Sequence, residues 1–300
     1  MACAAACLAL GAHALAGPPP APTASPPPSS SPPPSPEAED GKPRRIMSTN
    51  MCSDLLLLML VPKDRIASIT YLAHDAVEVL MPGADRGVAI NYGTAEDVVR
   101  YRPDLILASP WSTPVLRRLA VRVGAPVVEI DSANSFEDIR RITRQIGELV
   151  GEPERAEALV ARMDRDLAAL AATRPAEPLE VVAWSSGDSV PGEGTLTHEI
   201  ILAAGAVNLA TRTPDATYSS FGLEELLAAR PDAIMRGEDR YDAPSLRESA
   251  SEHPVVRKAF HGRRITYPAS LYTCGLPQSA RAARDLRMAL AAVPRGGVPW

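Results

Sequence analysis

Aromatic residues are scarce in this 300-residue chain, at 4% of the total, and there are only four cysteines and five histidines. The core must therefore consist mainly of Ala, Leu, Val and Ile, and each aromatic side chain merits individual inspection. The net charge is −5 at pH 7 and no stripe of Lys and Arg stands out, so nucleic acid is not expected as a partner. The composition, 46% hydrophobic and 22% charged, is typical of a soluble protein of one large or two smaller domains.

Several catalytic and metal-binding patterns are also missing. No Gly-rich phosphate loop follows the first expected strand, which argues against dinucleotide and P-loop sites. No Gly-x-Ser-x-Gly elbow is present, so we do not expect an enzyme, and generic esters and phosphates should not be turned over. The histidines beyond residue 17 form no close-spaced ligand set, which disfavours a receptor for a bare metal ion: His74, His198, His253 and His261.

The N-terminal 43 residues are not expected to belong to the fold. Residues 1–17 are apolar, too short to span a bilayer, which takes about 20 residues, and contain the small-x-small pattern Ala14-Leu15-Ala16. They predict a secretory signal and a location in the periplasm or cell envelope, tethered or free, although a misassigned start codon would also explain the missing basic residues. Residues 18–43 are rich in Pro and Ser and predict a stiff spacer or a disordered N-terminus.

From Arg44 onward, short apolar strands alternate with amphipathic helices, which predicts an α/β fold with mainly parallel sheets. Two α/β halves, 44–150 and 175–300, are joined by a linker, 151–174, that contains one long helix over Pro153–Thr173. Strands are expected at 44–48, 65–72, 104–109, 126–130, 179–185, 232–237 and 263–268. Helices are expected at 52–61, 94–101, 113–123, 135–150, 197–205, 222–231, 253–260 and 277–293.

One short pattern occurs in both halves. "EDVVRYRPDLIL" begins at Glu96 and "EELLAARPDAIM" begins at Glu224, each with Glu seven residues before the proline of an Arg-Pro-Asp. The Pro-Asp is explained by a helix-to-strand connection, with Pro as the stop and Asp as the turn residue. A glutamate in a first helical turn is ordinary as well, so this pattern alone leaves the role of the two glutamates open.

The segments "STNMCSDLLLLMLVPKDRIASITYL", "NYGTAEDVVRYRPDLILAS" and "GAPVVEIDSANSFEDIRRITRQIGELVGEPERAEALV" resemble the class III substrate-binding proteins of ABC importers for ferric siderophores, haem and vitamin B12. The resemblance covers about Arg44 to Val293 and rests on order and spacing. It implies two Rossmann-like lobes, a ligand cleft between them and a helical hinge. It also implies a monomeric receptor without a cofactor, which carries a metal chelate to a permease dimer. Glu96 and Glu224 match the acidic residues that dock on that permease.

Ligands of open α/β sheets bind beyond the carboxyl ends of the strands. The side chains expected there, which we take as candidate ligand contacts, are Asn50, Cys52, Tyr71, Tyr92, Trp111, Trp184, Tyr218, Arg236 and Tyr272. The aromatic faces suit a large planar ligand, and Arg236 suits an anionic group. For any single aromatic residue, packing at the edge of the core is an equal alternative.

The resemblance also places Cys52 and Cys274 near the cleft, where "YTCGLP" resembles a Trp-x-Cys-Gly-x-Pro pattern of some members. A disulfide tying the lobes together is the first hypothesis and needs Cα atoms within about 7 Å. A thiol pair at the ligand and two unrelated buried residues are the alternatives. The sequence does not separate ferric siderophore, cobalamin and haem, and an enzyme or a non-transport scaffold on the same fold is the alternative function.

Overall fold

A computed structural model describes residues 41–111, 114–184, 190–212, 217–219, 221–238 and 252–296. The predicted leader, 1–17, and nearly all of the predicted spacer, 18–43, lie outside the described residues. Within the described ranges, no helix is both long and apolar enough to cross a membrane.

The N-terminal half is built on a five-stranded sheet in the order β3-β2-β1-β4-β5, in which every pairing is parallel. Its strands are β1 (Ile46–Ser48), β2 (Ile66–Thr70), β3 (Ile90–Asn91), β4 (Leu105–Ala108) and β5 (Val127–Glu129). Its helices are α1 (Met51–Leu60), α2 (Ala73–Leu80), α3 (Ala95–Tyr101), α4 (Pro114–Arg122) and α5 (Phe136–Leu149). The chain runs outward from β1 to one edge and then returns to β4, so the switch point of the sheet lies between β1 and β4.

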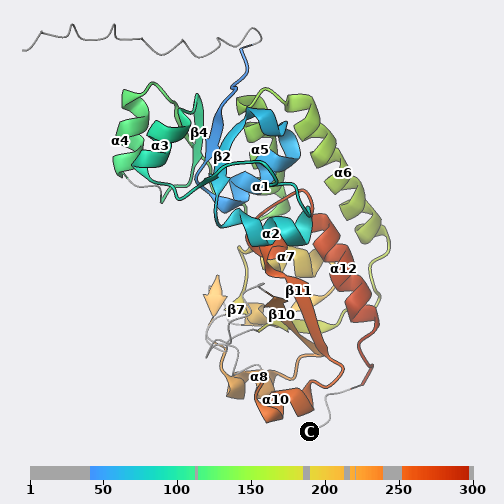
Figure 1. The fold of residues 1–300 in the computed structure, drawn as a ribbon. Helices are drawn as coiled ribbons and strands as arrows, with labels where there is room; N and C mark the ends of the chain where they lie inside the picture. The colour runs from blue at the N-terminus through green and yellow to red at the C-terminus, as the bar shows by residue number, and fades with distance from the viewer. Residues whose placement is uncertain are drawn as a thin grey trace, which may run out of the picture. The chain divides into compact units, whose positions relative to one another are not determined.

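The C-terminal half is built on a four-stranded parallel sheet in the order β11-β10-β6-β8, with a separate two-stranded antiparallel sheet of β7 and β9. The strands are β6 (Glu180–Ala183), β7 (Val190–Pro191), β8 (Val207–Asn208), β9 (Tyr218–Ser219), β10 (Ala233–Glu238) and β11 (Arg264–Pro268). The helices are α7 (Leu196–Ala203), α8 (Leu223–Ala229), α10 (Pro254–Ala259), α11 (Ala269–Thr273) and α12 (Ser279–Ala291). These two sheets confirm the predicted α/β class (Figure 1).

One long helix, α6 (Pro153–Ala172), connects the two halves and matches the helix predicted there. It packs against α5 at one end and against α12 and α7 further along (Figure 1). A glycine makes the first contact close: a Cβ added at Gly147 would lie 2.4 Å from the Cβ of Ala156. The absence of a side chain at this position lets the α5 and α6 backbones approach each other.

The repeated Arg-Pro-Asp has a common structural role in both halves. Arg102 and Arg230 end α3 and α8 in the left-handed region, with φ of 42° and 49°, because the following proline prevents the helix from continuing. Asp104 then accepts hydrogen bonds from the N–H groups of Arg44 and Arg45, just before β1. Asp232 accepts one from the N–H of Glu180, at the start of β6, over 2.8 Å. The motif therefore attaches each new strand to its parallel neighbour.

The structure differs from the expected elements in a few places. The strand predicted at 65–72 ends at Thr70. The helix α2, which was not predicted, begins at Ala73 and buries Ala73, Ala76 and Val77 at helical spacing. Asn91 ends β3, which was not among the expected strands, and Gly93 turns the chain with φ of 70°. The sequence analysis also did not predict α11, β7 or β9, which are only two to five residues long.

Candidate functional site

The carboxyl edge of the N-terminal sheet carries three of the predicted ligand contacts as exposed aromatic side chains. Tyr71 directly follows β2 and Tyr92 directly follows β3, with 52% and 69% of each side chain exposed. Because Thr70 pairs with Asn91 in the parallel register, the two tyrosines emerge side by side, and their rings stack with centroids 5.2 Å apart. Trp111, after β4, is 89% exposed. In a chain with so few aromatic residues, this exposure favours a binding surface over core packing.

Asn50 lies beyond the carboxyl end of β1, as predicted, which is at the switch point between β1 and β4, but its side chain caps a helix of the fold. Its Oδ1 accepts hydrogen bonds from the N–H groups of Cys52 and Ser53 and so caps α1. The side chain is therefore fixed at this edge of the sheet.

Two predicted contacts of the C-terminal half are accessible. Tyr218 on β9 is 64% exposed. Arg236 on β10 is half-buried and forms an ion pair with Glu252 over 3.2 Å, and Glu252 also pairs with Arg264. The hydrogen bond from Arg264 and the nearby cations hold the pKa of Glu252 below its usual range. An anionic ligand at Arg236 would thus compete with a carboxylate already in place.

Trp184 and Tyr272 are core residues in the structure, which does not place them as ligand contacts. Trp184 is 1% exposed, and its Nε1 donates a hydrogen bond to the carbonyl of Phe221 over 2.7 Å. Tyr272 is 6% exposed and packs on Tyr267, with ring centroids 3.9 Å apart, and burial raises its pKa. Trp184 directly follows β6 and Tyr272 lies within α11, but both side chains are buried. For these two, the alternative of packing in the core describes the structure.

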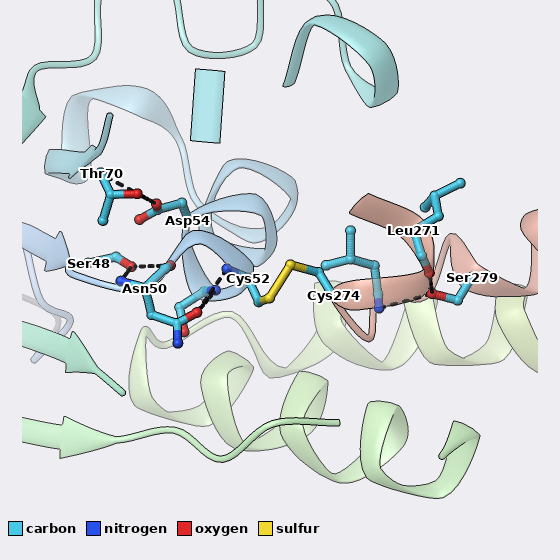
Figure 2. Close-up of a disulfide and its surroundings, with 10 residues drawn as sticks. Ser48, Asn50, Cys52, Asp54, Thr70, Leu271, Cys274 and Ser279 are labelled. Atoms are coloured by element: carbon cyan, nitrogen blue, oxygen red, sulfur yellow. Dashed lines mark hydrogen bonds between the residues drawn. A yellow bond between two sulfur atoms is a disulfide. The ribbon is translucent and has the colours of Figure 1, made fainter. Parts of the chain in front are cut away.

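Cys52 and Cys274 form a disulfide, with Cα atoms 5.0 Å apart and a separation of 222 positions in the chain (Figure 2). Cys52 is half-buried in the first turn of α1, and Cys274 is fully buried after α11. The sulfur of Cys52 is therefore not available as a free thiol for a ligand. A pocket of about 30 Å³ beside the disulfide is lined by both halves, including Asn50, Asp131 and Thr273. That volume holds only one or two water molecules, so a metal chelate does not fit inside it.

A buried carboxyl group near the disulfide was missed in the sequence. Asp54 on α1 is fully buried, and its Oδ2 accepts hydrogen bonds from the N–H and the hydroxyl of Thr70, over 3.1 and 2.5 Å (Figure 2). Its Oδ1 has no hydrogen-bond partner among the described residues. Burial raises the pKa of Asp54 from 3.8 to about 7, against the hydrogen bonds from Thr70 and the nearby Ser48 hydroxyl, which favour the ionised form. The sequence contains a signal for this buried carboxyl group, because Asp54 is a single acidic residue directly before the apolar run "LLLLML".

Asp54 predicts a distinct pH dependence of stability. A carboxyl whose pKa is raised in the folded state keeps a proton that the unfolded chain releases, so its contribution is favourable at low pH and is lost as pH rises from about 4 to 7. We expect the free energy of unfolding of the wild type, minus that of Asp54→Asn, to fall by roughly 2 kcal/mol between pH 5 and pH 7. Urea unfolding at several pH values measures it. Other titrating groups cancel in the difference, and two parallel curves would contradict the assignment.

Glu96 and Glu224 occupy equivalent positions in the two halves. Each is the second residue of its helix, α3 or α8, and each side chain is exposed. Val98 and Leu226, two residues further on, are buried and hold the opposite face of each helix against the fold. The two carboxylates are thus presented to solvent by the same local structure.

No cluster of three or more His, Cys, Asp or Glu side chains that could hold a metal ion occurs among the described residues. Of the candidate residues, Tyr71, Tyr92, Trp111 and Tyr218 are exposed aromatic side chains, Glu96 and Glu224 are exposed carboxylates, and Arg236 is half-buried.

The sequence model of the periplasmic binding protein family matches residues 46–253. A cobalamin-binding protein of Halobacterium salinarum is 28% identical over 219 residues, which cover 68% of this chain and 57% of that protein. The chain thus spans little more than half the length of this curated relative. Two solved structures share the fold. Haem-binding RhuT of Roseiflexus has a TM-score of 0.68 and 20% sequence identity, and the match covers 84% of this chain and 99% of RhuT. Haem-binding HutB of Vibrio cholerae has a TM-score of 0.69 and 18% sequence identity, and the match covers 82% of this chain and 98% of HutB.

The parallel sheets, the long connecting helix and the match over most of the folded chain agree with one another. The chain belongs to the periplasmic binding protein family.

Proposed function

We propose that the protein is the substrate-binding receptor of an ABC importer and that its ligand is a metal chelate of the cobalamin or haem type, or a ferric siderophore. The observation that carries this is the exposed aromatic group of Tyr71, Tyr92 and Trp111 at the carboxyl edge of the N-terminal sheet. Flat aromatic faces with polar tips suit a planar, partly apolar ligand. The cobalamin-binding relative and the haem-binding structures support the same ligand class.

The receptor role requires no chemistry from the protein. The ligand rests against the aromatic group, and Arg236 supplies a positive charge for an anionic substituent at the cost of its pair with Glu252. The alternatives on this fold, an enzyme or a scaffold outside transport, have no supporting residue constellation among the described residues.

Tryptophan fluorescence tests the ligand directly. Trp111 is exposed while Trp184 is buried, so a ligand at the aromatic group should quench mainly Trp111. We expect saturable quenching at sub-micromolar concentration by one of cyanocobalamin, haemin or a ferric siderophore. Trp111→Phe should remove most of the signal, and Tyr71→Ala should raise Kd about tenfold or more.

Val121→Ala is the matched control, because Val121 is an exposed apolar residue near the C-terminal end of α4. It should leave Kd unchanged. If none of the ligands quenches a folded protein, the proposed ligand class is wrong. If Val121→Ala weakens binding as much as Tyr71→Ala, the site lies elsewhere.

We further propose that Glu96 and Glu224 dock the receptor on a permease dimer. Support comes from their equivalent, exposed positions in the first turns of α3 and α8. Exposed charge pairs of this kind mainly steer association. Co-reconstitution with the permease should show slower association for Glu96→Gln/Glu224→Gln and unchanged association for Glu154→Gln, an exposed first-turn glutamate of α6. Equal association rates for the double variant and the wild type would contradict the proposed docking role of the two glutamates.

A further inference from the structure

We propose that the Cys52–Cys274 disulfide and the backbone contact at Gly275 together form a fixed joint between the N-terminal half (β1 to α5) and the C-terminal half (β6 to α12). This inference concerns the freedom of the two halves and does not depend on the identity of the ligand.

The disulfide is a second covalent connection between the halves. The first is α6, which leaves α5 and leads into β6. Two bodies joined by one link can rotate about it in several directions, whereas a second link at another place leaves mainly the rotation about the line through both links. The bond joins α1, in the N-terminal half, to the segment after α11, in the C-terminal half (Figure 2).

Both cysteines of the disulfide lie in segments that hydrogen bonds hold in place. On the N-terminal side, the backbone N–H of Cys52 donates to the Asn50 side chain in the capped first turn of α1. On the C-terminal side, the N–H of Cys274 donates to the carbonyl of Ser270 at the end of α11. Ser279, fully buried, accepts from the N–H of Leu276 and donates to the carbonyl of Leu271 (Figure 2). Because hydrogen bonds hold both sulfur-bearing segments within their own halves, a movement at the bond must move the halves themselves.

Gly275 adds a direct steric contact beside the disulfide. A Cβ added at this glycine would lie 2.2 Å from the Cβ of Ala133 and 3.0 Å from Cγ1 of Ile139. Both of these residues are buried and belong to the N-terminal half. The φ of Gly275 is not in the left-handed region, so the glycine is required by the close approach and not by the turn. The backbone of one half is thus in van der Waals contact with side chains of the other.

Pulsed electron–electron distance measurements test the joint. Spin labels attached through a keto amino acid at Val121 and Met288, exposed positions on α4 and α12, leave the cysteines untouched. We expect a narrow distance distribution in the bonded protein and a distribution at least twice as wide in Cys52→Ser/Cys274→Ser. A Val121–Val255 pair reports a second direction.

Reduction of the wild type provides a second comparison without substitution. One dithiothreitol supplies two electrons, the sulfur–sulfur bond breaks to two thiols, and the dithiothreitol closes to its cyclic disulfide. We expect the same widening. Unchanged widths in both label pairs, at full folding by circular dichroism, would overturn the fixed joint. So would equal widening in a label pair placed within one half, Val121 with Val79, because the loss would then be general and not specific to the joint.

Discussion

Cys52→Ser/Cys274→Ser is expected to lower the free energy of unfolding by about 3 to 5 kcal/mol. The bond closes a loop of 222 residues, and the entropy that such a loop removes from the unfolded chain amounts to roughly 5 kcal/mol in the chain-entropy treatment. Natural disulfides cost about 2 to 5 kcal/mol when removed, so the expected value lies in the upper part of that range. Serine at both positions avoids leaving a single reactive thiol.

Urea unfolding of the non-reduced wild type and the double serine variant measures this loss. The matched control is the same comparison in dithiothreitol, where the wild type also lacks the bond and the two proteins should unfold within about 1 kcal/mol of each other. A difference that persists under reducing conditions would assign the loss to the serine hydroxyls in a buried setting. No difference under either condition would mean that the bond does not stabilise the fold.

Arg287→Met is expected to cost about 3 kcal/mol, the second-largest effect. The guanidinium of Arg287, on α12, donates to the carbonyls of Ala203 and Ala204 at the end of α7. It also donates to the carbonyl of Leu170 and to Thr173 at the end of α6. Burial, and next the charge of Arg174, lower the pKa of Arg287. One side chain therefore satisfies the terminal carbonyls of two helices, and methionine would leave them without a donor.

Two variants on related positions make this prediction specific. Arg287→Lys keeps the positive charge but replaces the planar guanidinium group with a compact ammonium group. It should therefore recover only part of the lost free energy of unfolding. Arg284→Met removes an exposed arginine of the same helix, whose partner is Asp285, and should change stability by less than about 0.5 kcal/mol. Thermal and urea unfolding give the values. An Arg287→Met variant as stable as Arg284→Met would show that the helix ends need no donor from α12.

The sequence was sufficient for the fold class because the alternation of strands and helices is a local signal repeated along most of the chain. It also located Tyr71, Tyr92 and Trp111 at strand ends, where the structure places them. It could not show that Tyr71 and Tyr92 stack, because the pairing of β2 with β3 is a tertiary contact without a hairpin turn. Nor could position alone distinguish the inward-facing Trp184 from the outward-facing Trp111, since both follow buried strands and the difference is set by packing.

The separation of the two cysteines in the chain bears on how the protein is made. A chain is synthesised from its N-terminus, and domains begin to fold before synthesis ends. Cys52 belongs to α1, whereas Cys274 follows 222 residues later. The thiol of Cys52 therefore stays unbonded while the residues between the two cysteines are synthesised. A chain interrupted before α11 keeps that thiol at a helix N-terminus, where thiolates are favoured and reactive. The bond can thus close only on chains that have been synthesised beyond Cys274, and an oxidised Cys52–Cys274 pair shows that synthesis has passed α11.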